Sequence, residues 1–203
     1  NTEAGYETWM NTVGHVTPEI VISEVMTANR STLLNSDGQL CDWVELHNTS
    51  DESVDISGFT LSDNTNNNKY LIPEGTLLTG GGYLEVYCNA SVKNGAVAPF
   101  GLSQLGGEYV VLKTDDGRIV EIVDSLPMES GESQQMGENG RWNVSRMSSA
   151  GYPNTQEGHD AYLKSIGGYG GTVTISEIMA SNQAFMADAQ GRFTDWVEIC
   201  NTG

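Results

Sequence analysis

Short runs of alternating apolar and polar residues, rich in β-branched and aromatic side chains, fill most of the chain. In order they read EIVISEVM, DWVELHN, FTLSD, KYLI, YLEVYC, EYVVLKT and RIVEIVD, with further strands expected near residues 134–136 and 141–145. Turn-forming clusters such as NSDG, SDNTNNN, TGGGY and TDDG separate the runs. Many short strands at such spacing are typical of an antiparallel sandwich. The pattern therefore predicts an all-β fold, with TDDG as a hairpin turn.

Helical periodicity is confined to two short stretches. The first covers residues 2–13 and the second occupies equivalent positions; their apolar residues are Tyr6, Trp9, Met10 and Val13, and then His159, Tyr162, Leu163 and Ile166. The i, i+3, i+4, i+7 spacing predicts short amphipathic helices. The second is followed by GGYGG at 167–171, where we expect a flexible joint. Each helix either sets the angle between domains or covers an edge of its own domain.

The stretch ISEVMTANRSTLLNSDGQLCDWVELHN, from Ile22 to Asn48, recurs without a gap from Ile175, at an offset of 153 residues. The positions kept in both copies include Ser23, Glu24, Asn29, Gly38, Asp42, Trp43, Glu45 and Asn48. Solenoid repeats span roughly 20–50 residues, so this period indicates a repeated domain. We expect a linker helix after a preceding repeat (1–18), a β-sandwich (19–153), a second linker (154–173) and the N-terminal fragment of another domain (174–203).

Three blocks of the sequence carry a resemblance to a known family. They are ISEVMTANRSTLLNSDGQLCDWVELHNTSDESVDISGFTLSDN, KYLIPEGTLLTGGGYLEVYC and GLSQLGGEYVVLKTDDGRIVEIVDS. In this order they resemble the lamin-tail domain family in its bacterial form, over about residues 20–155. The resemblance implies an immunoglobulin-like antiparallel β-sandwich. It also implies a non-catalytic accessory module of a larger secreted or cell-surface protein, serving as a spacer or binding a protein or other extracellular ligand, and it supplies no catalytic residues.

The charge balance narrows the classes of partner. The chain has 27 acidic and 9 basic residues, a formal net charge of −18. This charge repels nucleic acid and anionic lipid surfaces, and it favours cationic partners and calcium. The sequence has no run of 18 apolar residues, so we expect no membrane insertion.

Asp37, Asp42 and Glu45, with Glu24 as an alternative to Glu45, are the candidate ligands for a cation such as calcium. This stretch lacks the D-x-[DN]-x-[DN]-G spacing, and Asp37 is replaced by Gln190 in the second copy. Asp42 and Glu45 are three residues apart, so on a strand they point to opposite faces and form no acid–base pair. We therefore expect no catalytic residues and no cofactor. The alternative function is a metal-dependent, calcium-assisted hydrolase or its substrate-binding module.

Cys41 and Cys88 would form a disulfide only if their strands are neighbours; otherwise they are buried free thiols. The fragment 174–203 raises a separate question, because two strands cannot bury an apolar face by themselves. We expect this fragment to associate with an exposed strand edge or to exchange between chains.

Overall fold

The computed structural model describes residues 19–30, 32–91, 95–167 and 173–201. The helix predicted over residues 2–13 lies outside these ranges. The chain forms two compact units, which divide between Tyr162 and Leu163. Each unit is described by itself below.

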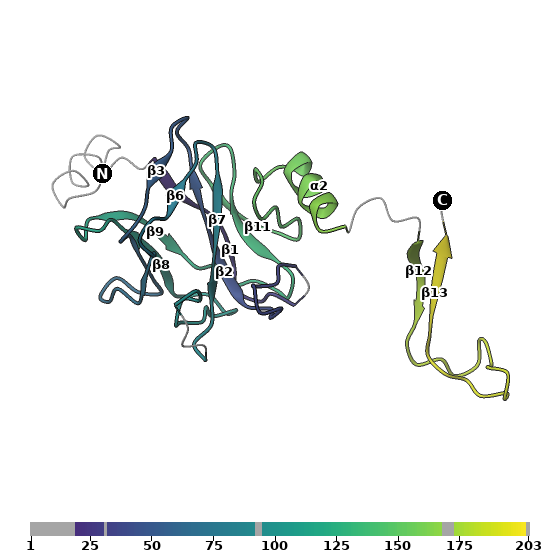
Figure 1. Cartoon of the computed structure of the whole chain (residues 1–203). Helices are drawn as coiled ribbons and strands as arrows, with labels where there is room; N and C mark the ends of the chain where they lie inside the picture. Colours follow the sequence, from purple (N-terminus) through teal and green to yellow (C-terminus); the bar gives the residue numbers. More distant parts are fainter. Residues whose placement is uncertain (1–18, 31, 92–94, 168–172, 202–203) are drawn as a thin grey trace. The chain divides into compact units, whose positions relative to one another are not determined.

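The first unit contains two main sheets (Figure 1). The five-stranded sheet has the order β11 (Trp142–Ser145), β10 (Ser133–Met136), β1 (Ile20–Met26), β2 (Asp42–Asn48), β7 (Tyr83–Cys88). The four-stranded sheet has the order β5 (Tyr70–Leu71), β4 (Thr60–Ser62), β8 (Tyr109–Lys113), β9 (Ile119–Asp124), and β3 (Val54–Asp55) pairs with β6 (Leu77–Leu78). All these neighbouring strands pair antiparallel. The predicted all-β, immunoglobulin-like sandwich is confirmed.

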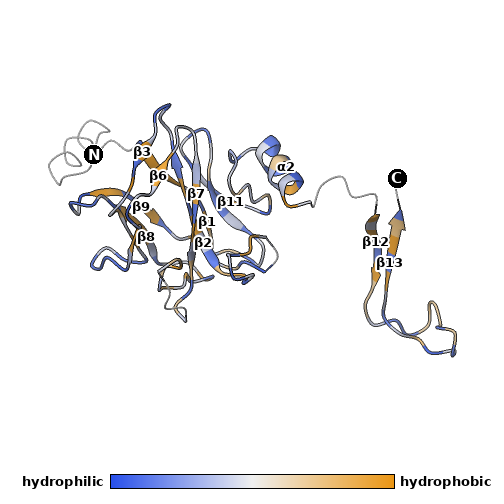
Figure 2. Ribbon diagram, in the orientation of Figure 1, coloured by the Kyte–Doolittle hydropathy of each residue, from blue (hydrophilic) through white to orange (hydrophobic). Residues whose placement is uncertain are grey.

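Residue alternation along the strands builds the core between the sheets. On β2, Val44 and Leu46 are fully buried in one cluster with Ile22 and Val25 of β1. The other sheet contributes a matching set to this cluster: Leu61, Val110, Leu112, Val120 and Val123. Figure 2 shows apolar residues along the strands and hydrophilic residues in most of the turns. Each fully buried aliphatic side chain contributes about 1.5–3 kcal/mol, so this cluster is the main stabilising element of the sandwich.

A β-bulge interrupts the pairing of β1 with β2. Ile22 lies opposite Leu46 and Glu24 lies opposite Glu45, so Ser23 is an extra residue on β1. Ile22 and Val25 belong to the core cluster, and the side chains of Ser23 and Glu24 both make their contacts on the other face of the sheet. The bulge thus places two consecutive polar side chains on the face that points away from the core.

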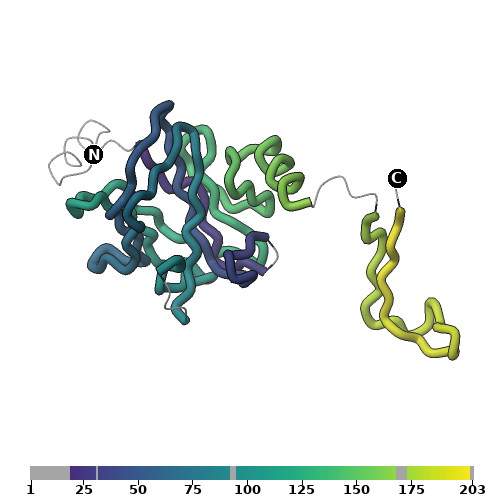
Figure 3. The backbone as a smooth tube through the Cα atoms, in the orientation of Figure 1, coloured from purple at the N-terminus to yellow at the C-terminus, as the bar shows by residue number. Residues whose placement is uncertain are grey.

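The helix α2 (Gln156–Ser165) begins within the first unit. The Thr155 hydroxyl accepts a hydrogen bond from the Gly158 N–H, which caps the first turn. His159 Nδ1 lies 2.6 Å from the Ser148 carbonyl oxygen, and Tyr162 is only 2% exposed. The chain can be followed from β11 through this segment to α2 in Figure 3. For Gln156–Tyr162, the observed packing is that of a helix covering its own domain.

The second unit reproduces the opening of the first. It pairs β12 (Val173–Met179) with β13 (Trp196–Asn201), and its register shifts between Ile175 and Glu177, as that of β1 does between Ile22 and Glu24. Its apolar strand residues are exposed, with fractions of 63% for Ile175 and 67% for Ile199. This unit therefore has the local geometry of β1 and β2, and its own described residues leave its apolar face uncovered.

Cys41 and Cys88 are both buried and both free, so the structure has thiols where the sequence left a disulfide open. Cys200 is also free. Within the described ranges, the structure contains no helix whose length and apolar character would let it cross a membrane.

Candidate functional site

We call the face of the five-stranded sheet that points away from the core the outer face. The registers of β1, β2 and β7 arrange its side chains in three rows. The first row is Val21, His47 and Tyr83; the middle row is Ser23 with Glu24, then Glu45 and Glu85; the third row is Met26, Trp43 and Tyr87. The middle row is covered by a later segment of the chain, whereas the first row borders an open cavity, which is the candidate site.

The middle row holds two fully buried carboxyl groups. One Glu45 oxygen accepts a hydrogen bond from the Ser23 hydroxyl at 2.5 Å, and the other accepts one from the Gly151 N–H at 2.6 Å. Glu24 accepts hydrogen bonds from Gln135 Nε2 at 3.0 Å and from the Ser149 N–H at 3.1 Å. Buried polar groups are tolerated when they are paired in this way.

Burial raises the pKa of both carboxyl groups. Loss of hydration raises the pKa of Glu45 to about 8, although the hydrogen bonds from Ser23 and Gly151 act in the opposite direction. Desolvation also raises the pKa of Glu24, against the hydrogen bonds from Gln135 and Ser149. The neighbouring carboxylates add repulsion that favours the neutral form of Glu45. At neutral pH the Glu45 carboxyl therefore holds its proton.

Residues 148–155, which we call the clasp, cover the middle row. The Asn154 side-chain amide donates to the Ser23 carbonyl at 2.7 Å and to the Met136 carbonyl at 3.1 Å, so it joins β1 to β10. Its oxygen accepts a hydrogen bond from the Ser149 hydroxyl at 2.7 Å, which holds the clasp in shape. Together with the hydrogen bond from Gly151 to Glu45, these contacts attach the clasp to the bulged part of β1, at the point where the chain leaves the sandwich.

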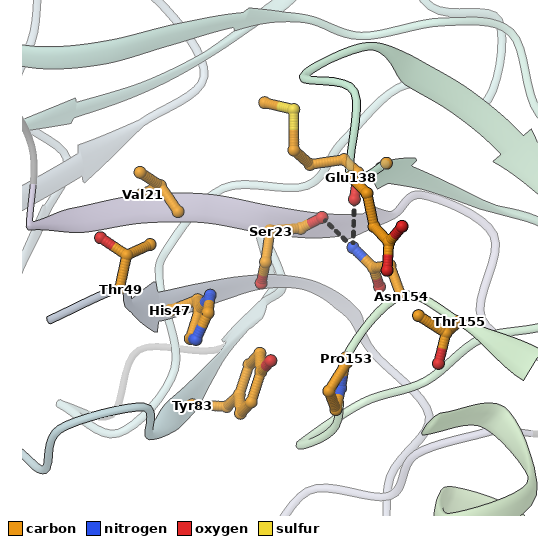
Figure 4. A pocket seen from close by; sticks show the side chains of 11 residues that line it. Val21, Ser23, His47, Thr49, Tyr83, Glu138, Pro153, Asn154 and Thr155 are labelled. Carbon is orange, nitrogen blue, oxygen red and sulfur yellow. Dashed lines mark hydrogen bonds between the residues drawn. The ribbon is translucent and has the colours of Figure 1, made fainter. Parts of the chain in front are cut away.

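The first row is not covered by the clasp, and a cavity of about 240 Å³ opens beside it. Figure 4 shows Val21, His47 and Tyr83 on one side of this cavity and Pro153, Asn154 and Thr155 on the other, with Ser23 between them. The rings of His47 and Tyr83 are stacked, with centroids 4.2 Å apart and planes 6° apart. Desolvation lowers the pKa of His47, so its imidazole is neutral at neutral pH.

The cavity offers apolar surface from Val21, Met136 and Pro153 together with the exposed carboxylate of Glu138. The Tyr83 hydroxyl and the neutral His47 ring add hydrogen-bonding groups. Carboxylate and imidazole accept hydrogen bonds, so this set suits a small ligand or side chain that carries donors. Mixed apolar and polar lining of this kind is suited to reversible recognition.

The candidate cation ligands Asp37, Asp42 and Glu45 are not brought together. Asp42 Oδ2 accepts the Leu102 N–H at 3.0 Å on the core side of β2, while Glu45 lies under the clasp on the outer face. Asp37 is exposed on the turn before β2. In the portion of the chain that the structure describes, no group of three or more His, Cys, Asp or Glu residues is placed to hold a metal ion. The opposite orientation of Asp42 and Glu45 agrees with their three-residue spacing.

The other repeated residues support the loops of the sandwich. The Asn29 side chain donates to the carbonyls of Leu33 and Cys41, and that of Asn48 donates to the carbonyls of Glu52, Leu78 and Thr79. Gly38 adopts a positive φ of 72° in the turn before β2, and Trp43 is fully buried. In the second unit, Asn182 makes the bonds of Asn29, to Met186 and Thr194, and Ser176 donates to Glu198 as Ser23 does to Glu45.

Sequence reasoning did not identify His47, Tyr83, Gly151 or Asn154 as parts of a site. One signal for Asn154 was present, because Asn154-Thr155 matches Asn1-Thr2 at the repeat offset of 153. The stacked pair had no such signal, since His47 corresponds to Cys200 in the second copy.

Comparison with known proteins agrees with the fold. The family model described as Lamin Tail Domain matches residues 14–127, which is more than half of the chain. A comparison with curated proteins gave no match. Lamin tail domains are a family of non-enzymatic, immunoglobulin-like domains, and the sandwich described above has the same fold. The chain belongs to the lamin tail domain family.

Proposed function

We propose that this chain is part of a non-catalytic accessory array in a larger secreted or cell-surface protein, of the type found in bacteria. Its lamin tail domains recur every 153 residues, and residues 174–203 begin a second one. Each domain spaces its neighbours and presents a surface for an extracellular partner. The repeat at a constant offset and the shared bulge of β1 and β12 support this proposal.

The observation that carries the spacer role is the attachment of the linker to the domain. Asn154 and Gly151 bind the outer face through the bonds to Ser23, Met136 and Glu45. The chain therefore leaves the sandwich at a fixed point and passes directly into α2, whose Tyr162 is buried. Fixing the backbone of each residue costs about 1–2 kcal/mol of conformational entropy. The hydrogen bonds of the clasp offset this cost, and a flexible linker would lack such bonds.

Small-angle X-ray scattering of a protein in which residues 19–171 are joined twice in tandem tests this role. We expect a broader distribution of maximum dimension for Asn154→Ala in the first repeat than for the wild-type tandem protein. Asn66→Ala, in an exposed turn, is the matched control and should leave the distribution unchanged. A wild-type distribution as broad as that of a Gly/Ser-linked tandem would contradict the proposal.

We also propose that the second unit associates through its strands when its own remaining strands are absent. The exposed Ile175, Ile178, Val197 and Ile199 form an apolar face of the kind that drives such pairing. Analytical ultracentrifugation of residues 1–203 should show concentration-dependent dimers, and removal of residues 168–203 should abolish them. A strict monomer at all concentrations would rule out this association.

A further inference from the structure

The strand β7 lies at the end of the five-stranded sheet, and among the residues that the structure describes its side away from β2 is paired only at the C-terminal end. Toward β2 it offers the main-chain groups of even-numbered residues, as the bond from the Asn48 N–H to the Gly82 carbonyl shows. Toward the free side, the Tyr87 carbonyl accepts the Ala98 N–H at 2.7 Å, and the Asn89 N–H donates to the Ala98 carbonyl at 2.9 Å. Main-chain direction alternates along a strand, so Tyr83 and Glu85 point the same way as Tyr87.

The main-chain N–H and C=O groups of Tyr83 and Glu85 have no hydrogen-bond partner on this side among the residues that the structure describes. Ala98 reaches only the C-terminal end of β7. The remaining edge is a row of donors and acceptors with the spacing of a β-ladder, which is the surface that an added strand recognises.

A groove runs beside this edge. It has a volume of about 310 Å³ and lies between β7 and the edge of the other sheet, with Leu84 and Val86 on one wall and Tyr70, Ile72 and Pro73 on the other. Ser36 and Ala96, from two loops, also line it. Leu84, Val86, Tyr70 and Ile72 all belong to the core or pack against it, so the groove is an opening in the flank of the sandwich.

The charge of the edge indicates the chemistry of the occupant. Glu85 lines the groove and extends from β7 on the outer face, opposite Glu45. In an added strand, alternate side chains would point toward Leu84 and Val86 and the others toward Glu85. The first set must be apolar, and the second set is favoured when basic because Glu85 is acidic; the net charge of −18 favours a basic partner in the same direction. Strands of a second copy carry Glu177 and Glu198, which would meet Glu85 with like charge.

We propose that this groove binds an extended peptide segment of alternating apolar and basic residues, from a partner protein, as an added strand on β7. This binding mode goes beyond the spacer role and does not depend on it. The main-chain groups of Tyr83 and Glu85 supply the ladder, the groove takes the apolar side chains, and Glu85 pairs with a basic one.

The test is a titration of the full ¹⁵N-labelled chain with a blocked hexapeptide of alternating lysine and valine, followed by amide chemical shifts. We expect saturable shifts at Tyr83, Glu85 and Tyr87 and slower hydrogen exchange of the Glu85 amide. Glu85→Gln should weaken binding about two- to fivefold, the effect of losing one exposed ion pair. Glu52→Gln removes the same charge from an exposed loop outside the groove and should bind like the wild type.

Two further peptides test the proposal on the wild-type chain, without any substitution in the protein. The same hexapeptide with alternate amide nitrogens methylated cannot donate to the edge and should not bind. A hexapeptide of alternating glutamate and valine should bind at least several-fold more weakly. Equal binding of the methylated peptide would overturn the added strand, equal binding of the acidic peptide would overturn the charge rule, and no shifts along β7 would overturn the site.

Discussion

Glu24 on β1 and Glu45 on β2 are cross-strand neighbours, and both of their carboxyl groups are fully buried on the outer face. The β-bulge at Ser23 makes this pairing possible, because it turns Glu24 to the same face as Ser23. The clasp then supplies N–H donors from Ser149 and Gly151 to the two carboxyls. A pair of buried acids thus holds a segment of the same chain.

The first prediction concerns pH. The folded pKa of Glu45 is about 8, above its ordinary value of 4.5, so the folded state keeps a proton that the unfolded chain releases between these values. The free energy of unfolding should therefore fall as pH rises across this window. Glu121 and Asp42, with pKa values raised by burial to about 7 and about 6, act in the same direction. Urea unfolding at intervals from pH 5 to pH 9 measures the effect.

Glu45→Gln isolates the contribution of this one group. The variant cannot ionise, so its stability should vary less between pH 5 and pH 9 than that of the wild type. Glu138→Gln, at an exposed position, should keep the wild-type dependence. Superimposable pH profiles for Glu45→Gln and the wild type would show that Glu45 is not the group that titrates.

The second prediction concerns the clasp. Asn154→Ala removes two hydrogen bonds to the carbonyls of Ser23 and Met136 and one from Ser149. Leaving such partners unsatisfied should lower the free energy of unfolding by about 1–3 kcal/mol, as measured by urea denaturation. Asn66→Ala, in an exposed turn, should change it by less than about 0.5 kcal/mol. Equal effects of the two substitutions would mean that the clasp adds nothing to stability.

The third prediction compares two glycines with positive φ. A Cβ on Gly106, at φ 70°, would lie 2.6 Å from the Ser125 carbonyl oxygen, whereas one on Gly117, at φ 83°, would meet nothing within 4 Å. Gly117→Ala should cost only the backbone strain, about 1 kcal/mol. Gly106→Ala adds a main-chain clash of about 1–3 kcal/mol. The midpoint temperature of thermal unfolding of the variant Gly106→Ala should therefore be well below that of Gly117→Ala.

Much of the fold could be predicted because its strands have strong local signals. DWVELHN and YLEVYC coincide with β2 and β7, and the other predicted runs each contain a strand of the structure. The two-residue strands β3 and β6 were missed, because two residues show no periodicity and neither strand contains an aromatic residue, as β5 does in the predicted run KYLI. The β-bulge at Ser23 was also missed, since one inserted residue leaves the apolar pattern of the strand almost unchanged.

The site was less predictable for a physical reason. Asp42 and Glu45 are close in sequence and were candidate cation ligands. Their environments, however, depend on residues that are far away in sequence, Leu102 for Asp42 and Gly151 for Glu45. The pocket similarly joins His47 and Tyr83 to Pro153. Such contacts arise from strand order and from the path of the clasp, and local spacing does not encode either one.

The clasp also determines where this domain can be cut. The family match ends at residue 127, before β10, β11 and the clasp. A protein trimmed to that match would expose Glu24 and Glu45 to water, remove two strands from the five-stranded sheet and leave β1 as an open edge. The smallest autonomous piece should instead extend through Tyr162, where the first unit ends, so the clasp and the start of α2 belong to the domain that they follow.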